Sequence, residues 1–305
     1  ARRMFETTKD SKYTDIMERA LFNGVISGMS LDGKSFFYVN PLEVNPEACE
    51  KDYFKRHVKP VRQKWFGCAC CPPNVARLLS SIGGYAFECS EEAIYMNLFV
   101  GGQIEAVLNG KKNTFHVETR YPWNGAVKIR VEKQEESAFT YAVRIPGWCQ
   151  NYELTINGVK PEYHVEKGYA ILNRMWKNGD EILLKMDMPV TLIEANPRVR
   201  EDIGKVAVMR GPVVYCLEEI DNQDQLQEIY LEENPVFTEA FEKDLLKGVV
   251  TLKTRGKRLS EKNWGEETLY RPYRGRTYEK QELTFIPYYA WTNRGVGEMT
   301  VWVRI

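Results

Sequence analysis

The chain has 305 residues, of which 43% are hydrophobic and 28% are charged, a composition typical of soluble globular proteins. Its 42 basic and 42 acidic side chains leave no net charge, which argues against a nucleic-acid partner because phosphate binding needs a positive surplus. No run of about 18 apolar residues occurs, so we expect no membrane-spanning helix and no membrane partner. The length predicts two or three domains.

The first 88 residues are predicted to be helical and irregular. Residues 1–5 have the pattern of a helix already under way, so we expect the chain to be a piece of a larger protein. Asp10 or Ser11 can cap a helix that ends at Gly28. The apolar positions of this helix roughly follow the 3.6-residue period of one buried face. These positions are Ile16, Met17, Ala20, Leu21, Val25 and Ile26.

Two further elements are predicted before residue 89. Residues 35–40 form a short extended segment that Pro41 closes. A helix begins at about Pro73 and ends at the glycine pair Gly83 and Gly84. A polar loop between these two elements leads into a cluster of cysteines.

From residue 89 to the end, the sequence changes to short runs of alternating apolar and polar residues, which predict strands. Asn-Gly pairs separate several of these runs, and both residues accept the positive φ of tight hairpins. Many strands without intervening helices predict antiparallel β-sandwiches. We therefore expect three domains, at residues 1–88, 89–190 and 191–305. The first group of strands is expected at residues 94–100, 103–108, 114–118, 127–132, 139–145, 153–156, 170–172 and 181–186.

Three of the seven cysteines, Cys68, Cys70 and Cys71, lie within four positions. Pro72 and Pro73 follow them and open the predicted helix. Thiols just ahead of a helix N-terminus are expected to have a lowered pKa, because the unpaired N–H groups there favour negative charge. Cysteines this close together indicate sulfur chemistry.

Three interpretations of the cluster remain open from its spacing. The cysteines are buried thiols, or ligands of a structural zinc ion, or a metal site in which one thiolate is a nucleophile. A structural zinc site normally brings its ligands as two spaced pairs, and this chain has no second pair. The third interpretation requires ligands from outside the chain, and a zinc-bound thiol is deprotonated at neutral pH.

The other four cysteines are widely spaced, and the total of seven is odd. A secreted disulfide scaffold would be shorter and richer in cysteine. We therefore expect reduced thiols and a cytoplasmic location.

The stretch from Trp65 to Leu79 resembles the signature of glycoside hydrolase family 127, the β-L-arabinofuranosidases. The resemblance extends over nearly the whole chain, at residues 1–4, 18–23, 36–42, 210–215 and 286–291. It implies an α+β multidomain fold, in which the C-terminal remnant of an (α/α)₆ barrel precedes two antiparallel β-sandwich domains. This agrees with the change from helical to strand-like sequence near residue 89.

The same resemblance implies a retaining exo-glycosidase that removes β-L-arabinofuranose from arabinofuranosyl oligosaccharides, with zinc as cofactor. In this family a zinc-held cysteine thiolate attacks the anomeric carbon, and a glutamic acid protonates the leaving oxygen. Water then hydrolyses the thioglycosyl intermediate. Sulfur thus replaces the carboxylate nucleophile of most retaining enzymes.

Carried over by motif, Cys70 resembles the nucleophile, and both Cys70 and Cys71 resemble zinc ligands. Glu18 and Tyr38 match positions that hydrogen-bond the sugar. The alternatives are a solvated helix carboxylate for Glu18 and a core aromatic residue for Tyr38. Cys68 receives no role.

The family's other two zinc ligands, a glutamate and a cysteine two residues apart, and its acid/base glutamate have no counterpart in these 305 residues. We therefore expect this chain alone to be inactive. The alternative function is a non-catalytic carbohydrate-binding or assembly module, because exposed rings at residues 288–291 would pack against sugars. A structural zinc module is the third candidate. We also expect a homodimer formed through the β-sandwiches.

Overall fold

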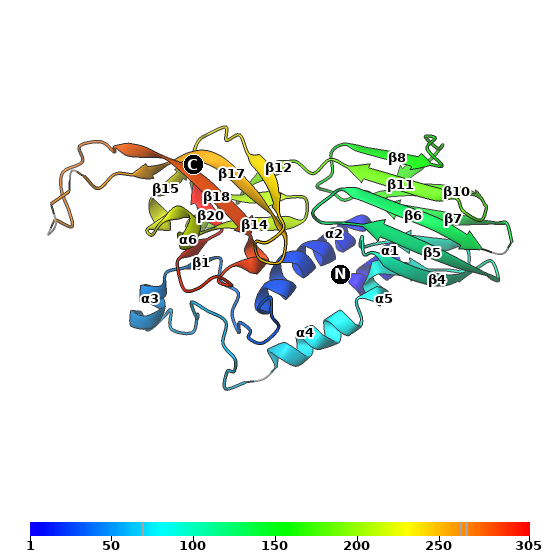
Figure 1. Ribbon diagram of the computed structural model, residues 1–305, viewed down its shortest axis with the longest axis horizontal. Coiled ribbons are helices and arrows are strands. Elements are labelled where there is room, and N and C mark those ends of the chain that lie inside the picture. The colour runs from blue at the N-terminus through cyan, green and yellow to red at the C-terminus, as the bar shows by residue number, and fades with distance from the viewer. Residues whose placement is uncertain (69, 134, 263, 266–267) are drawn as a thin grey trace. The chain divides into compact units, whose positions relative to one another are not determined.

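The computed structural model describes residues 1–68, 70–133, 135–262, 264–265 and 268–305. The chain divides into two compact units (Figure 1). Unit 1 combines residues 1–22 with 72–189, and unit 2 combines residues 23–71 with 190–305. Helices and extensive sheets occur together, which confirms the predicted α+β class. The three consecutive domains expected from the sequence stay a prediction.

Unit 1 begins with two short helices, α1 (Arg2–Thr8) and α2 (Ser11–Arg19). Asp10 caps α2 as predicted, since its Oδ1 accepts a hydrogen bond of 3.0 Å from the Lys12 N–H. The regular helix ends earlier than predicted. It continues as the π-helix η1 (Ala20–Val25) and the 3₁₀ helix η2 (Ile26–Gly28), and the chain passes into unit 2 within η1.

The predicted buried face of α2 is wrong. Ile16 is 57% exposed, whereas Ser11, Thr14 and Glu18 are buried. Thr14 Oγ1 lies 3.0 Å from Tyr169 Oη, and the Glu18 carboxylate has three hydrogen-bond partners, described below. Polar contacts within unit 1 therefore decide which side of α2 is covered.

The helix that follows the cysteines is α4 (Cys71–Ser80), and α5 (Gly83–Ala86) comes directly after it. The prediction of a helix from about Pro73 to the glycine pair is confirmed to within a turn. No residue of α4 is buried in the described chain, and Leu79 is 39% exposed.

The rest of unit 1 consists of two five-stranded sheets. The first has the order β2-β3-β7-β10-β9 and the second the order β4-β5-β6-β11-β8. The strands of the first sheet are β2 (Phe87–Cys89), β3 (Ala93–Met96), β7 (Ser137–Arg144), β9 (His164–Glu166) and β10 (Tyr169–Trp176). Those of the second are β4 (Gly102–Leu108), β5 (Lys111–Thr119), β6 (Ala126–Lys133), β8 (Tyr152–Ile156) and β11 (Glu181–Met186).

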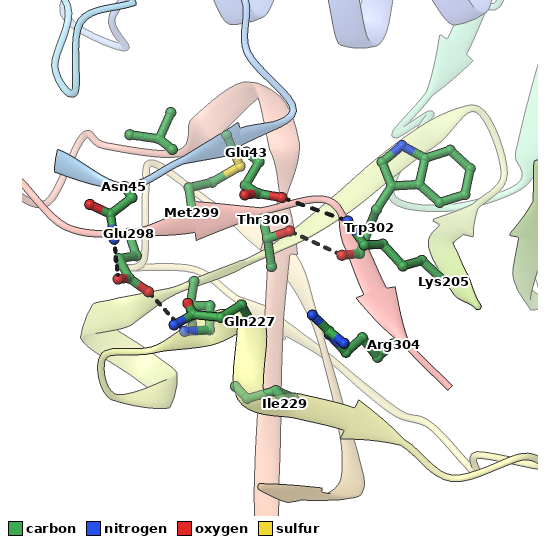
Figure 2. Close-up of a pocket in the computed structure, with 12 residues that line it drawn as sticks. Glu43, Asn45, Lys205, Gln227, Ile229, Glu298, Met299, Thr300, Trp302 and Arg304 are labelled. Atoms are coloured by element: carbon green, nitrogen blue, oxygen red, sulfur yellow. Dashed lines mark hydrogen bonds and ion pairs between the residues drawn. The ribbon is translucent and has the colours of Figure 1, made fainter. Parts of the chain in front are cut away.

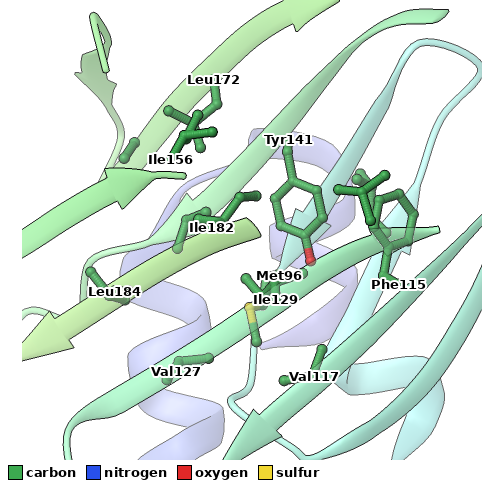
Figure 3. Close-up of a cluster of buried hydrophobic side chains, with 14 of the residues drawn as sticks. Met96, Phe115, Val117, Val127, Ile129, Tyr141, Ile156, Leu172, Ile182 and Leu184 are labelled. Atoms are coloured by element: carbon green, nitrogen blue, oxygen red, sulfur yellow. The ribbon is translucent and has the colours of Figure 1, made fainter. Parts of the chain in front are cut away.

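Both sheets contribute to one hydrophobic core, shown in Figure 3. Alternation places Ile129 and Val131 of β6 fully inside. Ile129 and Tyr141 of β7 belong to the same cluster in Figure 3. Asn109 and Gly110 have φ values of 50° and 74°, so the predicted tight turn between β4 and β5 is confirmed. In unit 1 one described pairing differs from the antiparallel prediction, because β3 runs parallel to β7, and in unit 2 β15 pairs parallel with β20.

Unit 2 is built on one ten-stranded sheet. Six strands pair in the order β14-β18-β17-β15-β20-β13. Because β13 also pairs with β14, these six strands form a closed ring. A closed ring leaves fewer free strand edges. The ten strands are β1 (Glu43–Val44), β12 (Val190–Glu194), β13 (Lys205–Arg210), β14 (Val213–Glu218), β15 (Ile229–Leu231), β16 (Thr238–Glu242), β17 (Val249–Leu259), β18 (Tyr278–Pro287), β19 (Met299–Thr300) and β20 (Trp302–Arg304).

Short helices connect these strands, and a second core lies against them. In this core Phe37 stacks on Trp291, with ring centroids 4.8 Å apart and an interplanar angle of 9°. No helix in the described ranges is long and apolar enough to cross a membrane. The short helices are α3 (Pro46–Lys51), η3 (Arg200–Asp202), α6 (Glu219–Asn222), η4 (Leu226–Glu228) and η5 (Tyr288–Ala290).

Candidate functional site

The three clustered cysteines lie together at the end of the first segment of unit 2. Cys68 and Cys70 are exposed, and Cys71, the first residue of α4, is half-buried. Cys70 Sγ lies 3.5 Å from Cys68 Sγ and 3.8 Å from Cys71 Sγ. The interpretation as buried thiols is therefore wrong. All seven cysteines are free thiols.

The sulfur positions can be compared with the needs of a zinc ion. Two ligands on a tetrahedral zinc ion, each with a Zn–S bond of about 2.3 Å, lie about 3.8 Å apart. The Cys70 and Cys71 sulfurs match this separation, so they fit two corners of such a site. Among the described residues, however, no group of three or more His, Cys, Asp or Glu side chains is arranged to hold a metal ion. The zinc cofactor stays a prediction.

The thiols also affect one another's acidity. Contact with the thiols of Cys68 and then of Cys71 raises the pKa of Cys70 to about 11. Hydrogen bonds from the backbone and the side chain of Cys70 lower the pKa of Cys68. The sequence predicts a lowered pKa for Cys70 from the helix end. The pKa of Cys70 is instead raised, and the hydrogen bonds with the Cys68 and Cys71 thiols are the main causes.

Tyr38 belongs to the same unit as the cysteines and lies near the chain that leads into them. Its ring packs against Phe66 at a centroid distance of 5.8 Å, and Phe36 packs against Phe66 at 5.1 Å. Tyr38 is 53% exposed, so the alternative of a core aromatic residue is wrong. A role in sugar binding stays a prediction.

Glu18 lies in unit 1 and is fully buried. Its carboxylate accepts hydrogen bonds from Tyr121 Oη at 2.6 Å, from Trp148 Nε1 at 3.2 Å and from Arg144 Nη2. The alternative of a solvated helix carboxylate is therefore wrong. Whether Glu18 also binds sugar stays a prediction, and in this structure both of its oxygens already have partners.

The aromatic segment at residues 288–291 does not form an exposed platform. Tyr288 is 3% exposed and Trp291 is 1% exposed. The Tyr288 hydroxyl donates a hydrogen bond of 2.8 Å to the Pro41 carbonyl. These rings belong to the core of unit 2, which removes the observation that motivated the non-catalytic carbohydrate-binding module.

One polar pocket of unit 2, shown in Figure 2, encloses a cavity of about 120 Å³. Lys205 Nζ lies 3.8 Å from a Glu43 carboxylate oxygen at its wall. Glu298 accepts hydrogen bonds from the Asn45 amide and the Leu226 N–H. None of the predicted site residues lines this pocket. The Glu43 and Glu298 carboxylates are paired with protein groups. The pocket therefore does not match the predicted thiol and zinc site.

Sequence reasoning missed one residue beside the predicted site. Arg62 is 8% exposed, and its guanidinium donates to three backbone carbonyls. The sequence gives no signal for Arg62, because its partners are backbone carbonyls and every residue type has one.

The comparisons with known proteins agree on one class, the glycoside hydrolases. Three profiles match successive parts of the chain. They are the GH127 catalytic domain of β-L-arabinofuranosidase at residues 1–84, the GH127 middle domain at residues 93–188 and the glycoside hydrolase family 127 C-terminal domain at residues 190–304. The chain belongs to glycoside hydrolase family 127.

Individual relatives point the same way. A non-reducing end β-L-arabinofuranosidase of Bifidobacterium longum subsp. longum is 36% identical over 315 residues, which cover 100% of this chain and 47% of the relative. The crystal structure of a GH127 β-L-arabinofuranosidase from Geobacillus stearothermophilus T6 is 51% identical with a TM-score of 0.95, covering 99% of this chain and 48% of that one. A second GH127 β-arabinofuranosidase structure is 38% identical with a TM-score of 0.88, covering 100% and 47%. The chain thus spans about half the length of these relatives.

Proposed function

We propose that this chain is the C-terminal part of a retaining exo-β-L-arabinofuranosidase with Cys70 as its nucleophile. The observation that carries the proposal is the pair of adjacent thiols at the start of α4, whose sulfurs lie 3.8 Å apart, with Cys70 exposed and Cys71 half-buried. The relatives named as β-L-arabinofuranosidases support the substrate class.

In this proposal the Cys70 thiolate attacks the anomeric carbon, forming a C–S bond as the glycosidic C–O bond breaks. The leaving oxygen takes its proton from a glutamic acid outside these 305 residues. Water then displaces the sulfur and releases arabinose with retained configuration. Cys70 and Cys71 would hold zinc, which when bound keeps the thiols deprotonated.

Because part of the ligand set and the acid/base glutamate have no counterpart here, the 305 residues alone do not hydrolyse glycosides in this proposal. Residues 1–88 are the remnant of the (α/α)₆ barrel, and residues 89–190 and 191–305 form the two sandwiches. Exposed apolar side chains on α1, α2 and α4, at Met4, Ile16 and Leu79, support this, because they offer surface for the rest of a barrel. A homodimer through the sheets remains part of the proposal.

The test is the Cys70→Ala variant of the complete protein, assayed on a β-L-arabinofuranosyl oligosaccharide. The proposal expects the loss of at least about 10³-fold in kcat, since the covalent step has no other nucleophile. Cys89→Ala is the matched control, because Cys89 is also an exposed free thiol but lies on β2. Near wild-type turnover of Cys70→Ala would refute the assignment.

A further inference from the structure

Arg62 holds together three parts of unit 2 that are distant in the sequence. Its Nε and Nη2 donate to the Ser27 carbonyl at 3.1 and 2.7 Å. Its Nη1 donates to the Trp291 carbonyl at 2.6 Å, and Nη2 also donates to the Tyr289 carbonyl at 3.0 Å. One side chain thus joins η2, the loop before the cysteines and the aromatic segment after β18.

Among the described residues, the positive charge of Arg62 is not held by a direct ion pair. Glu218 favours the charged form of Arg62, but the Glu218 carboxylate pairs with Arg294. The Arg62 guanidinium instead lies over the Phe37 ring at 4.6 Å and near the Trp291 ring at 6.0 Å. Burial lowers the pKa of Arg62 to about 10, so the group stays charged at neutral pH. Backbone carbonyls and aromatic faces hold a buried cation here.

The same segment leads directly to the candidate site. Next to Arg62, Gln63 exchanges two backbone hydrogen bonds of 2.9 Å with Phe36. Three residues further on, Phe66 packs against both Phe36 and Tyr38. Cys68 follows after one intervening residue. Residues 63–66, which lead into the cysteine cluster and are called the start of the cysteine loop below, are therefore fixed to the backbone at residues 36–38, which carries Tyr38.

We propose that Arg62 is a positioning residue that sets the cysteine loop and Tyr38 in their working arrangement. This inference rests on the proposed function of Cys70. Arg62 acts through Gln63 and Phe66, and it touches neither the thiols nor the Tyr38 ring.

The geometry requires a guanidinium. The planar fork donates to carbonyls in several directions at once, which the single ammonium of lysine cannot do. Arg62→Lys keeps the charge but loses part of the fork. Arg62→Lys is therefore expected to lose the positioning of the cysteine loop as Arg62→Ala does, even if it is more stable than Arg62→Ala.

The experiment compares Arg62→Ala and Arg62→Lys with Arg258→Ala in this chain. Arg258 is the matched control because it also donates to three backbone carbonyls of unit 2, those of Asn222, Asp224 and Gln225. The first readout is amide hydrogen exchange at Phe36, Phe37 and Gln63. The second is the affinity for phenylarsine oxide, which condenses with two nearby thiols to form two As–S bonds and release one water.

Both Arg62 variants are expected to exchange faster at these amides and to bind the arsenical about tenfold more weakly, a change of about 1.4 kcal/mol. Arg258→Ala is expected to lower the free energy of unfolding by about as much as Arg62→Ala does. It is expected to leave the amide exchange rates and the arsenical affinity within about twofold of the wild type.

Unchanged exchange or unchanged arsenical affinity in folded Arg62→Ala would overturn the positioning role. So would the same loss in Arg258→Ala, because it would show a general effect of instability. Neither readout depends on glycoside hydrolysis. Failure of this inference is thus distinguishable from failure of the proposed function, which the Cys70→Ala assay tests separately.

Discussion

The Glu18 carboxylate and the Arg144 guanidinium form an ion pair in which both side chains are buried. Asp15 adds a second carboxylate, with its Oδ1 2.6 Å from Arg144 Nη1. Burial alone would lower the pKa of Arg144, but Glu18, Tyr121 and Asp15 together outweigh it and the pKa is raised. The pair joins α2 to β7 within unit 1, so it fixes the helix on its sheet.

Removing the Glu18 charge leaves the buried Arg144 guanidinium with only one carboxylate partner among the described residues, Asp15, whose side chain is 23% exposed. We therefore predict that Glu18→Gln lowers the free energy of unfolding by about 3 kcal/mol. Urea denaturation measures this. Glu6→Gln is the control, because the exposed Glu6–Arg2 pair should contribute less than about 1 kcal/mol. Equal effects of the two substitutions would contradict the account.

Glu228 gives unit 2 a dependence on pH. Burial, followed by the hydrogen bond and repulsion from Glu261, raises the pKa of Glu228 to about 7, although Arg258 acts in the opposite direction. The folded state thus binds this proton more tightly than the unfolded state. Its contribution to stability is complete below the ordinary value of 4.5 and is lost as the pH rises through about 7.

We predict that Glu228→Gln removes this part of the pH dependence and makes the chain more stable than the wild type above about pH 7. Denaturation midpoints measured across this range test it. Glu242→Gln, on the exposed strand β16, serves as the control. A midpoint difference between Glu228→Gln and the wild type that stays constant with pH would show that Glu228 does not titrate in this window.

Sequence reasoning at the residue scale identified side chains by type and spacing. It singled out Cys70 and Cys71 because adjacent cysteines before a proline pair are unusual, and their roles stay a prediction. It could not find the partners of Glu18, because Arg144 lies 126 positions away in the chain. The role of Arg62 could not be predicted either, since its partners are backbone groups of residues that are distant in the sequence.

At the element scale, β17 has one position where only glycine fits. A Cβ on Gly256 would lie 2.5 Å from Leu283 Cδ1 and 2.7 Å from the Tyr230 carbonyl oxygen. Gly256 pairs with Leu231 of β15 on one side and with Gln281 of β18 on the other. Gly256 therefore lies on a strand of the closed ring that is paired on both sides, where neither β15 nor β18 can move freely.

We predict that Gly256→Ala lowers the free energy of unfolding by about 2 kcal/mol through overpacking. Gly24→Ala is the matched control, since a Cβ at Gly24 meets nothing within 4 Å. Thermal unfolding of both variants decides the point. If Gly256→Ala is as stable as Gly24→Ala, the close approach of β15 and β18 is not as described.

Local patterns predicted most elements but not all of their pairings. The strands of unit 1 follow the alternation of side chains, and Asn109-Gly110 marks a hairpin. The parallel pairing of β3 with β7 joins residues 93–96 to 140–143, and no local pattern links these segments. The face of α2 was misassigned because polar contacts to distant strands outweigh its apolar residues.

At the scale of the whole molecule, the two compact units each combine an early and a late part of the chain. Such an arrangement depends on contacts over long sequence separations, which sequence periodicity cannot show. Asn23 illustrates this, because its amide donates to the Pro212 carbonyl and its side-chain oxygen accepts from the Val214 N–H.

The central claim is that Cys70 becomes glycosylated during turnover. The most direct test is mass spectrometry of peptides from the complete protein after rapid quenching with a β-L-arabinofuranosyl substrate that has a good leaving group. The account predicts one arabinosyl group on the peptide that contains Cys70, and none in Cys70→Ala. An arabinosyl group on a carboxylate, or no adduct on Cys70 while hydrolysis continues in Cys70→Ala, would contradict it.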